Sequence, residues 1–264
     1  MPSVQRNGYH IHYDIRGRGK PLLLLNHSGV SNDGWHGGFL NALSAKYQLL
    51  LPEHRGTGAS SDDGDYEMID VARDALAVMD DSGVARADVF GISMGGAVAQ
   101  ELALAASDRV NRLVLAATFC GPRMSVPPER WTLPLFLRKP GQSPQDQIRR
   151  FLPVYYSREF LARHESIVVD LTARGAARNL RKTSLRKGLA NRRFDTYDRL
   201  VGIQADTLIL HGDADAIVPV ANAHILSERL PMSRVVVLAG AGHVITTERP
   251  LETARLVSEF LGST

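Results

Sequence analysis

The stretch Gly91-Ile92-Ser93-Met94-Gly95 decides the fold of this chain. It follows a short apolar run at residues 87–90 and precedes a small-residue helical pattern that starts at residue 95. Glycines two residues either side of a serine permit a sharp strand-to-helix turn, because side chains there would clash with neighbouring backbone. The turn holds the serine in a strained conformation with its hydroxyl above the sheet. The stretch therefore predicts a nucleophilic serine, Ser93.

The composition of the 264-residue chain is that of an ordinary globular protein. Hydrophobic residues make up 44% and charged residues 22% of it, and the length suffices for one large α/β unit with an insertion. No apolar run approaches the ~20 residues of a membrane span, and the first residues lack the apolar stretch of a secretory signal. Cys120 is the only cysteine, which excludes an intrachain disulfide. We therefore expect a cytoplasmic protein that does not bind membranes.

Apolar runs typical of strands alternate with amphipathic helical patterns on both sides of Ser93. An opening hairpin is predicted over residues 4–15. It is followed by strands at residues 22–25, 48–51, 88–91, 113–117, 207–210 and 235–238, and by helices at residues 39–46, 67–82, 95–106, 220–229 and 251–261. This alternation predicts an α/β fold with a mostly parallel sheet covered on both faces.

Residues 122–200 differ from their flanks in both pattern and charge. They carry 17 Lys and Arg against 7 Asp and Glu, whereas the whole chain has a net charge of only +3. The segment has helical patches but no strand-like run. We therefore divide the chain into an α/β core, residues 1–121 and 201–264, and a helical cap (lid) inserted at residues 122–200.

The basic charge of the cap includes a stripe that recurs every four residues. Its members, Arg174, Arg178, Lys182 and Arg186, share one helical face. Such a stripe is commonly a solvated face, and the alternative is that one or two arginines point inward and bind a substrate carboxylate. No recognition motif accompanies the charge, so we do not expect nucleic-acid binding.

Two later segments supply what a serine nucleophile requires. A serine hydroxyl needs a base to take its proton and an acid to orient that base. The strand at residues 207–210 runs into His211-Gly212-Asp213-Ala214-Asp215, and the strand at residues 235–238 into Gly240-Ala241-Gly242-His243. The glycines beside His243 allow this loop to bring the imidazole to Ser93. Both aspartates are candidates for the acid.

These motifs, together with the loop His54-Arg55-Gly56-Thr57-Gly58-Ala59-Ser60, resemble the α/β-hydrolase superfamily over nearly the whole chain. The resemblance implies the α/β-hydrolase fold, in which a mostly parallel eight-stranded sheet is flanked by helices and carries an inserted helical cap. It also implies a triad of Ser93, His243 and Asp215, the aspartate just before residues 216–219. Asp213 is then a turn residue that caps local backbone N–H groups.

The resemblance also implies an oxyanion hole made of two backbone N–H groups. One belongs to Met94, and the other to the loop after the strand at residues 22–25. That loop reads Asn26-His27-Ser28-Gly29, where most members of the superfamily have His-Gly-x. Counting back from Trp35 makes Ser28 the donor, and a shift of one residue would make it Gly29.

Four residues are candidate substrate contacts: His27, Gly29, Trp131 and Cys120. Structural roles are the alternative for three of them. His27 can hold its loop by hydrogen bonding, Trp131 can pack within an apolar patch of the cap, and Cys120 can be an inert buried thiol.

Three features resemble the 3-oxoadipate enol-lactonase branch of the superfamily: Asn26, the Gly-x-Ser-Met-Gly-Gly elbow and the Arg-Gly-x-Gly-x-Ser loop. Members of that branch hydrolyse a lactone that carries a free carboxylate. The resemblance thus implies hydrolysis of a carboxylic ester or lactone, with an anionic enol-lactone as one candidate, through an acyl-enzyme on Ser93. We expect a small-molecule substrate and no metal or organic cofactor, and the sequence indicates no oligomeric state.

Two alternatives to ester hydrolysis remain open from the sequence. The same triad can serve a carbon–carbon bond hydrolase or an acyltransferase, because these reactions depend on cap shape and water access. A non-enzymatic receptor that uses the pocket to bind a small molecule is the other alternative.

Overall fold

The computed structural model describes the chain except residues 1, 7, 62–63, 137–140, 176–179 and 263–264, and except the side chains of residues 136, 144, 180–185 and 187. In the described part, eight strands form one sheet in the order β1-β2-β4-β3-β5-β6-β7-β8. Their bounds are β1 Ser3–Arg6, β2 Tyr9–Arg16, β3 Lys20–Leu25, β4 Tyr47–Pro52, β5 Ala87–Ile92, β6 Val110–Ala116, β7 Asp206–Gly212 and β8 Ser233–Leu238.

All pairs of neighbouring strands from β4 to β8 are parallel, whereas β1–β2 and β2–β4 are antiparallel. The predicted hairpin and mostly parallel sheet are therefore confirmed. Alternate side chains of the central strands enter two different cores. Leu23 and Val89 pack with α2 (Met68–Asp81), α3 (Met94–Ala105) and α7 (Ala221–Arg229).

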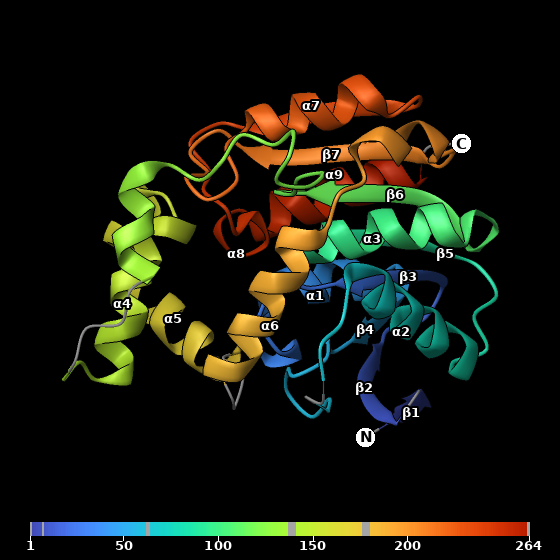
Figure 1. Cartoon of the computed structure of the whole chain (residues 1–264), viewed down its shortest axis with the longest axis horizontal. Coiled ribbons are helices and arrows are strands. Elements are labelled where there is room, and N and C mark those ends of the chain that lie inside the picture. Colours follow the sequence, from blue (N-terminus) through green and yellow to red (C-terminus); the bar gives the residue numbers. More distant parts are fainter. Residues whose placement is uncertain (1, 7, 62–63, 137–140, 176–179, 263–264) are drawn as a thin grey trace.

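Leu22 and Phe90 face the opposite side, where α1 (Gly37–Ser44) and α9 (Pro250–Gly262) cover the sheet. Figure 1 shows α2 and α3 on one face of the sheet and α1 and α9 on the other. Strands buried on both faces explain why their sequences are continuously apolar rather than alternating.

The chain between β6 and β7 forms several helices. These are the 3₁₀ helices η3 (Arg130–Phe136) and η4 (Tyr197–Gly202) and the α-helices α4 (Pro144–Tyr155), α5 (Arg158–Gly175) and α6 (Leu180–Arg193). Of these, α4 and α5 lie beside the carboxyl-end edge of the sheet (Figure 1), whereas η4 packs against α7 and α3. We call residues 122–200 the helical segment; its described residues form no strand. None of the described helices combines the length and apolar character needed to cross a membrane.

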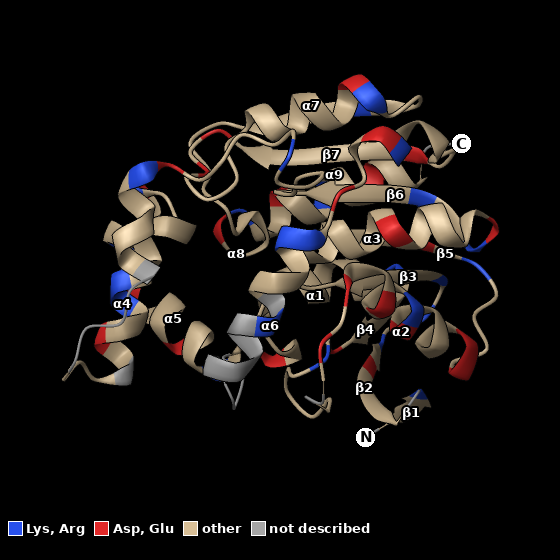
Figure 2. Cartoon of the chain, viewed as in Figure 1, with Lys and Arg blue, Asp and Glu red and all other residues tan. Residues whose placement is uncertain are grey.

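Both acidic and basic residues lie along α4 and α5 (Figure 2). The guanidinium of Arg149 is 3.5 Å from carboxylate oxygens of both Asp146 and Glu165, and Arg163 pairs with Glu159. These pairs are largely exposed, so they contribute little to stability.

Two members of the predicted basic stripe can be placed in the structure. Arg174 is exposed and Arg186 is partly buried. Arg178 and the side chain of Lys182 lie outside the described residues. Both interpretations of the stripe, a solvated face and a carboxylate site, therefore stay predictions.

Candidate active site

Ser93 lies at the turn between β5 and α3 with φ 56° and ψ −121°, a conformation that non-glycine residues rarely adopt. Its backbone is fixed from both sides. Its N–H donates to the carbonyl of Ala116 at 2.9 Å, and the hydroxyl of Thr118 donates to its carbonyl at 2.7 Å. Ser93 remains partly exposed, although Ile92 and Met94 on either side are buried. The turn thus presents the serine while burying its neighbours.

The glycines around Ser93 are required by close approaches of backbone. A Cβ atom on Gly91 would lie 2.3 Å from the carbonyl oxygen of Gly95, and one on Gly95 would lie 2.1 Å from that of Leu25. A Cβ on Gly96 would lie 2.6 Å from the side chain of Thr118. Every one of these distances is below the 3.0 Å limit that real Cβ atoms respect. The steric explanation offered from the sequence therefore agrees with the structure.

Asp215 follows β7 and is buried beside His243, which follows β8. Its Oδ2 accepts a hydrogen bond from Nδ1 of His243 at 2.7 Å, and its Oδ1 accepts from the backbone N–H groups of Ile217 and Val218 at 3.0 and 2.9 Å. Burial raises the pKa of Asp215, but the charge of His243 and hydrogen bonds from His211 and His243 outweigh it and lower the pKa to about 2. An ionised Asp215 accepts a hydrogen bond from Nδ1–H of His243, so Nε2 is the ring nitrogen that can accept a proton.

His211 supports the same carboxylate from within the core. Its Nε2 donates to the carbonyl of Val218 at 2.7 Å and lies 3.4 Å from Oδ2 of Asp215, and its side chain is fully buried. These contacts fix the turn after β7 that carries Asp215.

Asp213 accepts a hydrogen bond at 2.6 Å from the backbone N–H of Gly240, in the loop that follows β8. The sequence predicted a local N–H as its partner. The prediction was wrong about the location, because adjacent parallel strands bring the second loop within reach. Asp213 thereby joins the loop of Asp215 to the loop of His243.

Asn26 organises the loop after β3 through three backbone contacts. Its Oδ1 accepts from the N–H of His27 at 2.9 Å, and its Nδ2 donates to the carbonyls of Val30 and Ser31 at 3.4 and 3.3 Å. Nε2 of His54 lies 2.8 Å from the carbonyl of Asn26 and fixes the loop from the other side. An amide at this position can satisfy donors and acceptors together.

The candidate oxyanion donors differ in their place in the structure. Within the described residues, the N–H groups of Met94, Ser28 and Gly29 donate to no other residue. Met94 is the first residue of α3, Ser28 is exposed, and Gly29 has φ 75°. Both Ser28 and Gly29 therefore stay candidates for the second donor.

The remaining candidate contacts differ in how accessible they are. Trp131 is 47% exposed, and its Nε1 donates to Glu129 at 2.5 Å. Cys120 is buried, with its sulfur 3.8 Å from the hydroxyl of Ser125, and burial raises the pKa of its thiol. Contact of either residue with a substrate stays a prediction.

Tyr155, the last residue of α4, lies against the histidine loop, which the sequence did not predict. Its carbonyl accepts from the N–H groups of His243 and Val244 at 2.8 and 3.1 Å, and its ring centroid is 5.9 Å from that of His243. Burial raises the pKa of its hydroxyl. The contact joins residues far apart in the chain, so no local pattern could have revealed it.

Comparison with known proteins identifies the family of this chain. A family described as having the alpha/beta hydrolase fold matches residues 21–250. The chain belongs to the α/β-hydrolase family. Among curated relatives, a protein of Azorhizobium caulinodans named "Putative carbamate hydrolase RutD" is 28% identical over 269 residues, covering 99% of this chain and 98% of that protein.

Two further proteins similar to this α/β hydrolase have names that specify a substrate. The pimeloyl-[acyl-carrier protein] methyl ester esterase of Nitrosomonas europaea is 30% identical, covering 88% of this chain and 92% of its own. The crystal structure of the enol-lactonase from Burkholderia xenovorans superposes with a TM-score of 0.85 at 25% identity, covering 99% of this chain and 100% of that one.

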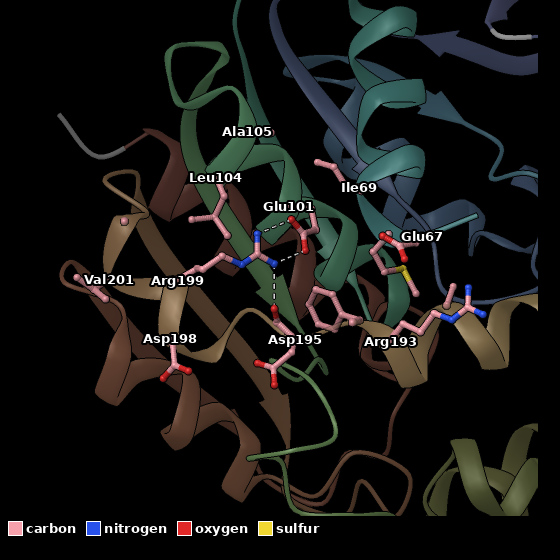
Figure 3. Close-up of a pocket in the computed structure, with 14 residues that line it drawn as sticks. Glu67, Ile69, Glu101, Leu104, Ala105, Arg193, Asp195, Asp198, Arg199 and Val201 are labelled. Carbon is pink, nitrogen blue, oxygen red and sulfur yellow. Dashed lines mark hydrogen bonds and ion pairs between the residues drawn. The ribbon is translucent and has the colours of Figure 1, made fainter. Parts of the chain in front are cut away.

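This α/β hydrolase also has a pocket of about 660 Å³ that is lined by other residues than the candidate active site (Figure 3). It lies between α2, α3, α6 and η4, and an ion pair of Glu101 with Arg199 forms part of its wall. Ser93, Asp215 and His243 do not line it. Among the described residues, no group of three or more His, Cys, Asp or Glu side chains is arranged to hold a metal ion.

Proposed function

We propose that this α/β hydrolase is a serine hydrolase that cleaves a carboxylic ester or lactone through an acyl-enzyme on Ser93. The observation that supports it best is the 2.7 Å hydrogen bond between the buried Asp215 and His243. This pair lies at the sheet edge where Ser93 leaves β5 in a strained turn. A serine, an oriented imidazole and a charged carboxylate are the parts that acyl transfer requires.

In the first half of the proposed reaction, Oγ of Ser93 attacks the substrate carbonyl and Nε2 of His243 takes the hydroxyl proton. Asp215 holds Nδ1–H of the imidazole and stabilises its charged form. The N–H groups of Met94 and Ser28 stabilise the oxyanion of the tetrahedral intermediate. His243 then protonates the leaving alkoxide, which in a lactone stays attached to the acyl group.

In the second half, His243 removes a proton from water, which attacks the acyl-enzyme and releases the carboxylic acid with Ser93 restored. The helical segment acts as the cap of the active site in this proposal. Its carbonyl groups on Tyr155 and Gly175 accept hydrogen bonds from the loops that carry His243 and Ser31. A cap fastened to both loops can limit the access of water and shape the substrate site.

The esterase and lactonase names of similar proteins support the choice of bond, and the sequence resemblance favours an anionic enol-lactone. The bond class can be tested by steady-state hydrolysis of a panel on wild type and on Ser93→Ala. The panel holds p-nitrophenyl acetate, a neutral γ-lactone, a carboxylate-bearing enol-lactone and a p-nitrophenyl carbamate.

We expect serine-dependent turnover of an ester or lactone, with the anionic lactone preferred. Turnover of the carbamate alone would replace the proposed bond class while keeping the serine mechanism. Absence of turnover across the panel would contradict the proposal and favour carbon–carbon hydrolysis, acyl transfer or a receptor.

A further inference from the structure

Glu248 ends the four-residue helix α8 (Ile245–Glu248) and joins two parts of the chain that the sequence does not connect. Its Oε2 accepts hydrogen bonds from the backbone N–H of Gly242 at 3.1 Å and from that of Ser157 at 3.2 Å. Its Oε1 accepts a hydrogen bond from the hydroxyl of Ser157. Glu248 is only 6% exposed, so its carboxylate depends on these three donors in place of water.

The two backbone segments that Glu248 joins also contact each other directly. Tyr155 O accepts from the N–H groups of His243 and Val244, and a Cβ on Gly242 would lie 2.8 Å from that same oxygen. The loop before His243 and the junction between α4 and α5 are therefore packed at backbone distance. Glu248 contacts both segments, and the Gly242 that Glu248 binds directly precedes His243.

We propose that Glu248 is a positioning residue that fastens the α4–α5 junction to the histidine loop and so keeps His243 in bonding distance of Asp215. This inference rests on the proposed function, in which His243 is the base. Glu248 acts through His243 and touches no reacting atom. The Glu248 carboxylate binds both Ser157 of the helical segment and Gly242 of the histidine loop, so a shift of the helical segment would also shift His243.

A carboxylate suits this place because all three of its partners are donors. An ionised carboxylate only accepts hydrogen bonds, and bonds to it are stronger than those between neutral groups. In Glu248→Gln, the amide oxygen can keep both backbone N–H groups while the NH₂ group donates to the Ser157 hydroxyl. In Glu248→Ala, the N–H groups of Gly242 and Ser157 lose their acceptor.

The experiment compares wild type, Glu248→Ala and Glu248→Gln with Glu252→Ala as the matched control. Glu252 is an exposed glutamate in the first turn of α9. For each protein, kcat and KM are measured on the ester that wild type hydrolyses. The rate at which a small fluorophosphonate phosphonylates Ser93 is measured as well. That rate reports activation of the serine by its base without a contribution from substrate binding.

For Glu248→Ala we expect kcat and the phosphonylation rate to fall together, by roughly ten- to hundredfold, with KM nearly unchanged. Glu248→Gln should recover most of the lost rate, and Glu252→Ala should match wild type. A Glu248→Ala protein with wild-type kcat and phosphonylation rate would overturn the inference. So would a loss confined to the melting temperature.

Failure of the proposed function has a different signature. If wild type itself neither hydrolyses an ester nor reacts with the fluorophosphonate, the serine mechanism is wrong. If Glu248→Ala does not fold, Ser157→Ala provides the test, because it removes the hydroxyl donor and keeps both backbone bonds. We then expect a phosphonylation rate several-fold below wild type, and an unchanged rate would overturn the inference.

Discussion

Nδ1 of His243 lies 2.7 Å from Oδ2 of Asp215 because the two residues follow neighbouring parallel strands. Gly212 at the end of β7 and Leu238 at the end of β8 are register partners, so the two loops leave the sheet side by side. The hydrogen bond from Gly240 to Asp213 connects the same loops a second time. Parallel pairing therefore places Asp215, the proposed acid, beside His243, the proposed base.

Replacing Asp215 by Asn should reduce kcat/KM by about 10⁴-fold, because an amide no longer holds the imidazole in the tautomer that can accept a proton. The measurement is steady-state hydrolysis of the preferred ester near neutral pH, together with circular dichroism to verify folding. A folded Asp215→Asn protein within tenfold of wild type would show that another group orients His243.

Asp215 should also make folding stability depend on pH in the acid range. Its pKa is about 2 in the folded protein against 3.8 for the ordinary carboxyl, so the unfolded state binds the proton more readily. The resulting stabilisation is fully present above about pH 4 and is lost as the pH falls through about 2.

Its size should be about 2 kcal/mol, from a shift of nearly two pKa units. The measurement is urea unfolding of wild type and Asp215→Asn at pH 5 and at pH 2. The difference in their free energies of unfolding should shrink by about this amount at the lower pH. A difference that stays constant would mean that Asp215 has an ordinary pKa.

Asn26→Ala should lower kcat by roughly ten- to a thousandfold, because the loop that holds the proposed oxyanion donor loses three side-chain hydrogen bonds. Ser28→Ala is the matched control, since it leaves the backbone N–H in place and should keep near wild-type kcat. Equal kcat values for the two variants would contradict the assigned role of this loop.

Much of the fold could be predicted from the sequence because its signals are local. The apolar runs that became the central strands β3 and β5 are short and largely buried on both faces. Gly91 and Gly95 flank Ser93 for a steric reason that the sequence pattern already indicates. Each of Ser93, Asp215 and His243 was predicted to stand in a loop directly after a strand. The family match supports the fold on which this prediction of a triad rests.

The contacts of the helical segment could not be predicted in the same way. Tyr155 and Ser157 meet the histidine loop through backbone atoms, which carry no sequence signature. Glu248 is only five residues after His243 in the sequence. Its burial could not be predicted from this, because a polar residue near a helix end is commonly exposed to water. Only the position of the α4–α5 junction shows that its carboxylate is buried.

Gly95→Ala should be strongly destabilising, because its Cβ would lie 2.1 Å from the backbone carbonyl oxygen of Leu25 at the end of β3. Gly188→Ala is the control: Gly188 lies in α6 with no atom within 4 Å of the added Cβ, so alanine should be neutral or slightly stabilising. Thermal melts of both variants provide the test. Equal melting temperatures for the two variants would contradict the claim that no side chain fits at position 95.

The most direct test of the account is to locate the covalent adduct formed with a fluorophosphonate, by peptide mapping with mass spectrometry on wild type and Ser93→Ala. We predict a single adduct on Ser93 in wild type and none in Ser93→Ala, which should remain folded. An adduct on another residue, or labelling that persists in Ser93→Ala, would contradict the assignment of Ser93 as the nucleophile.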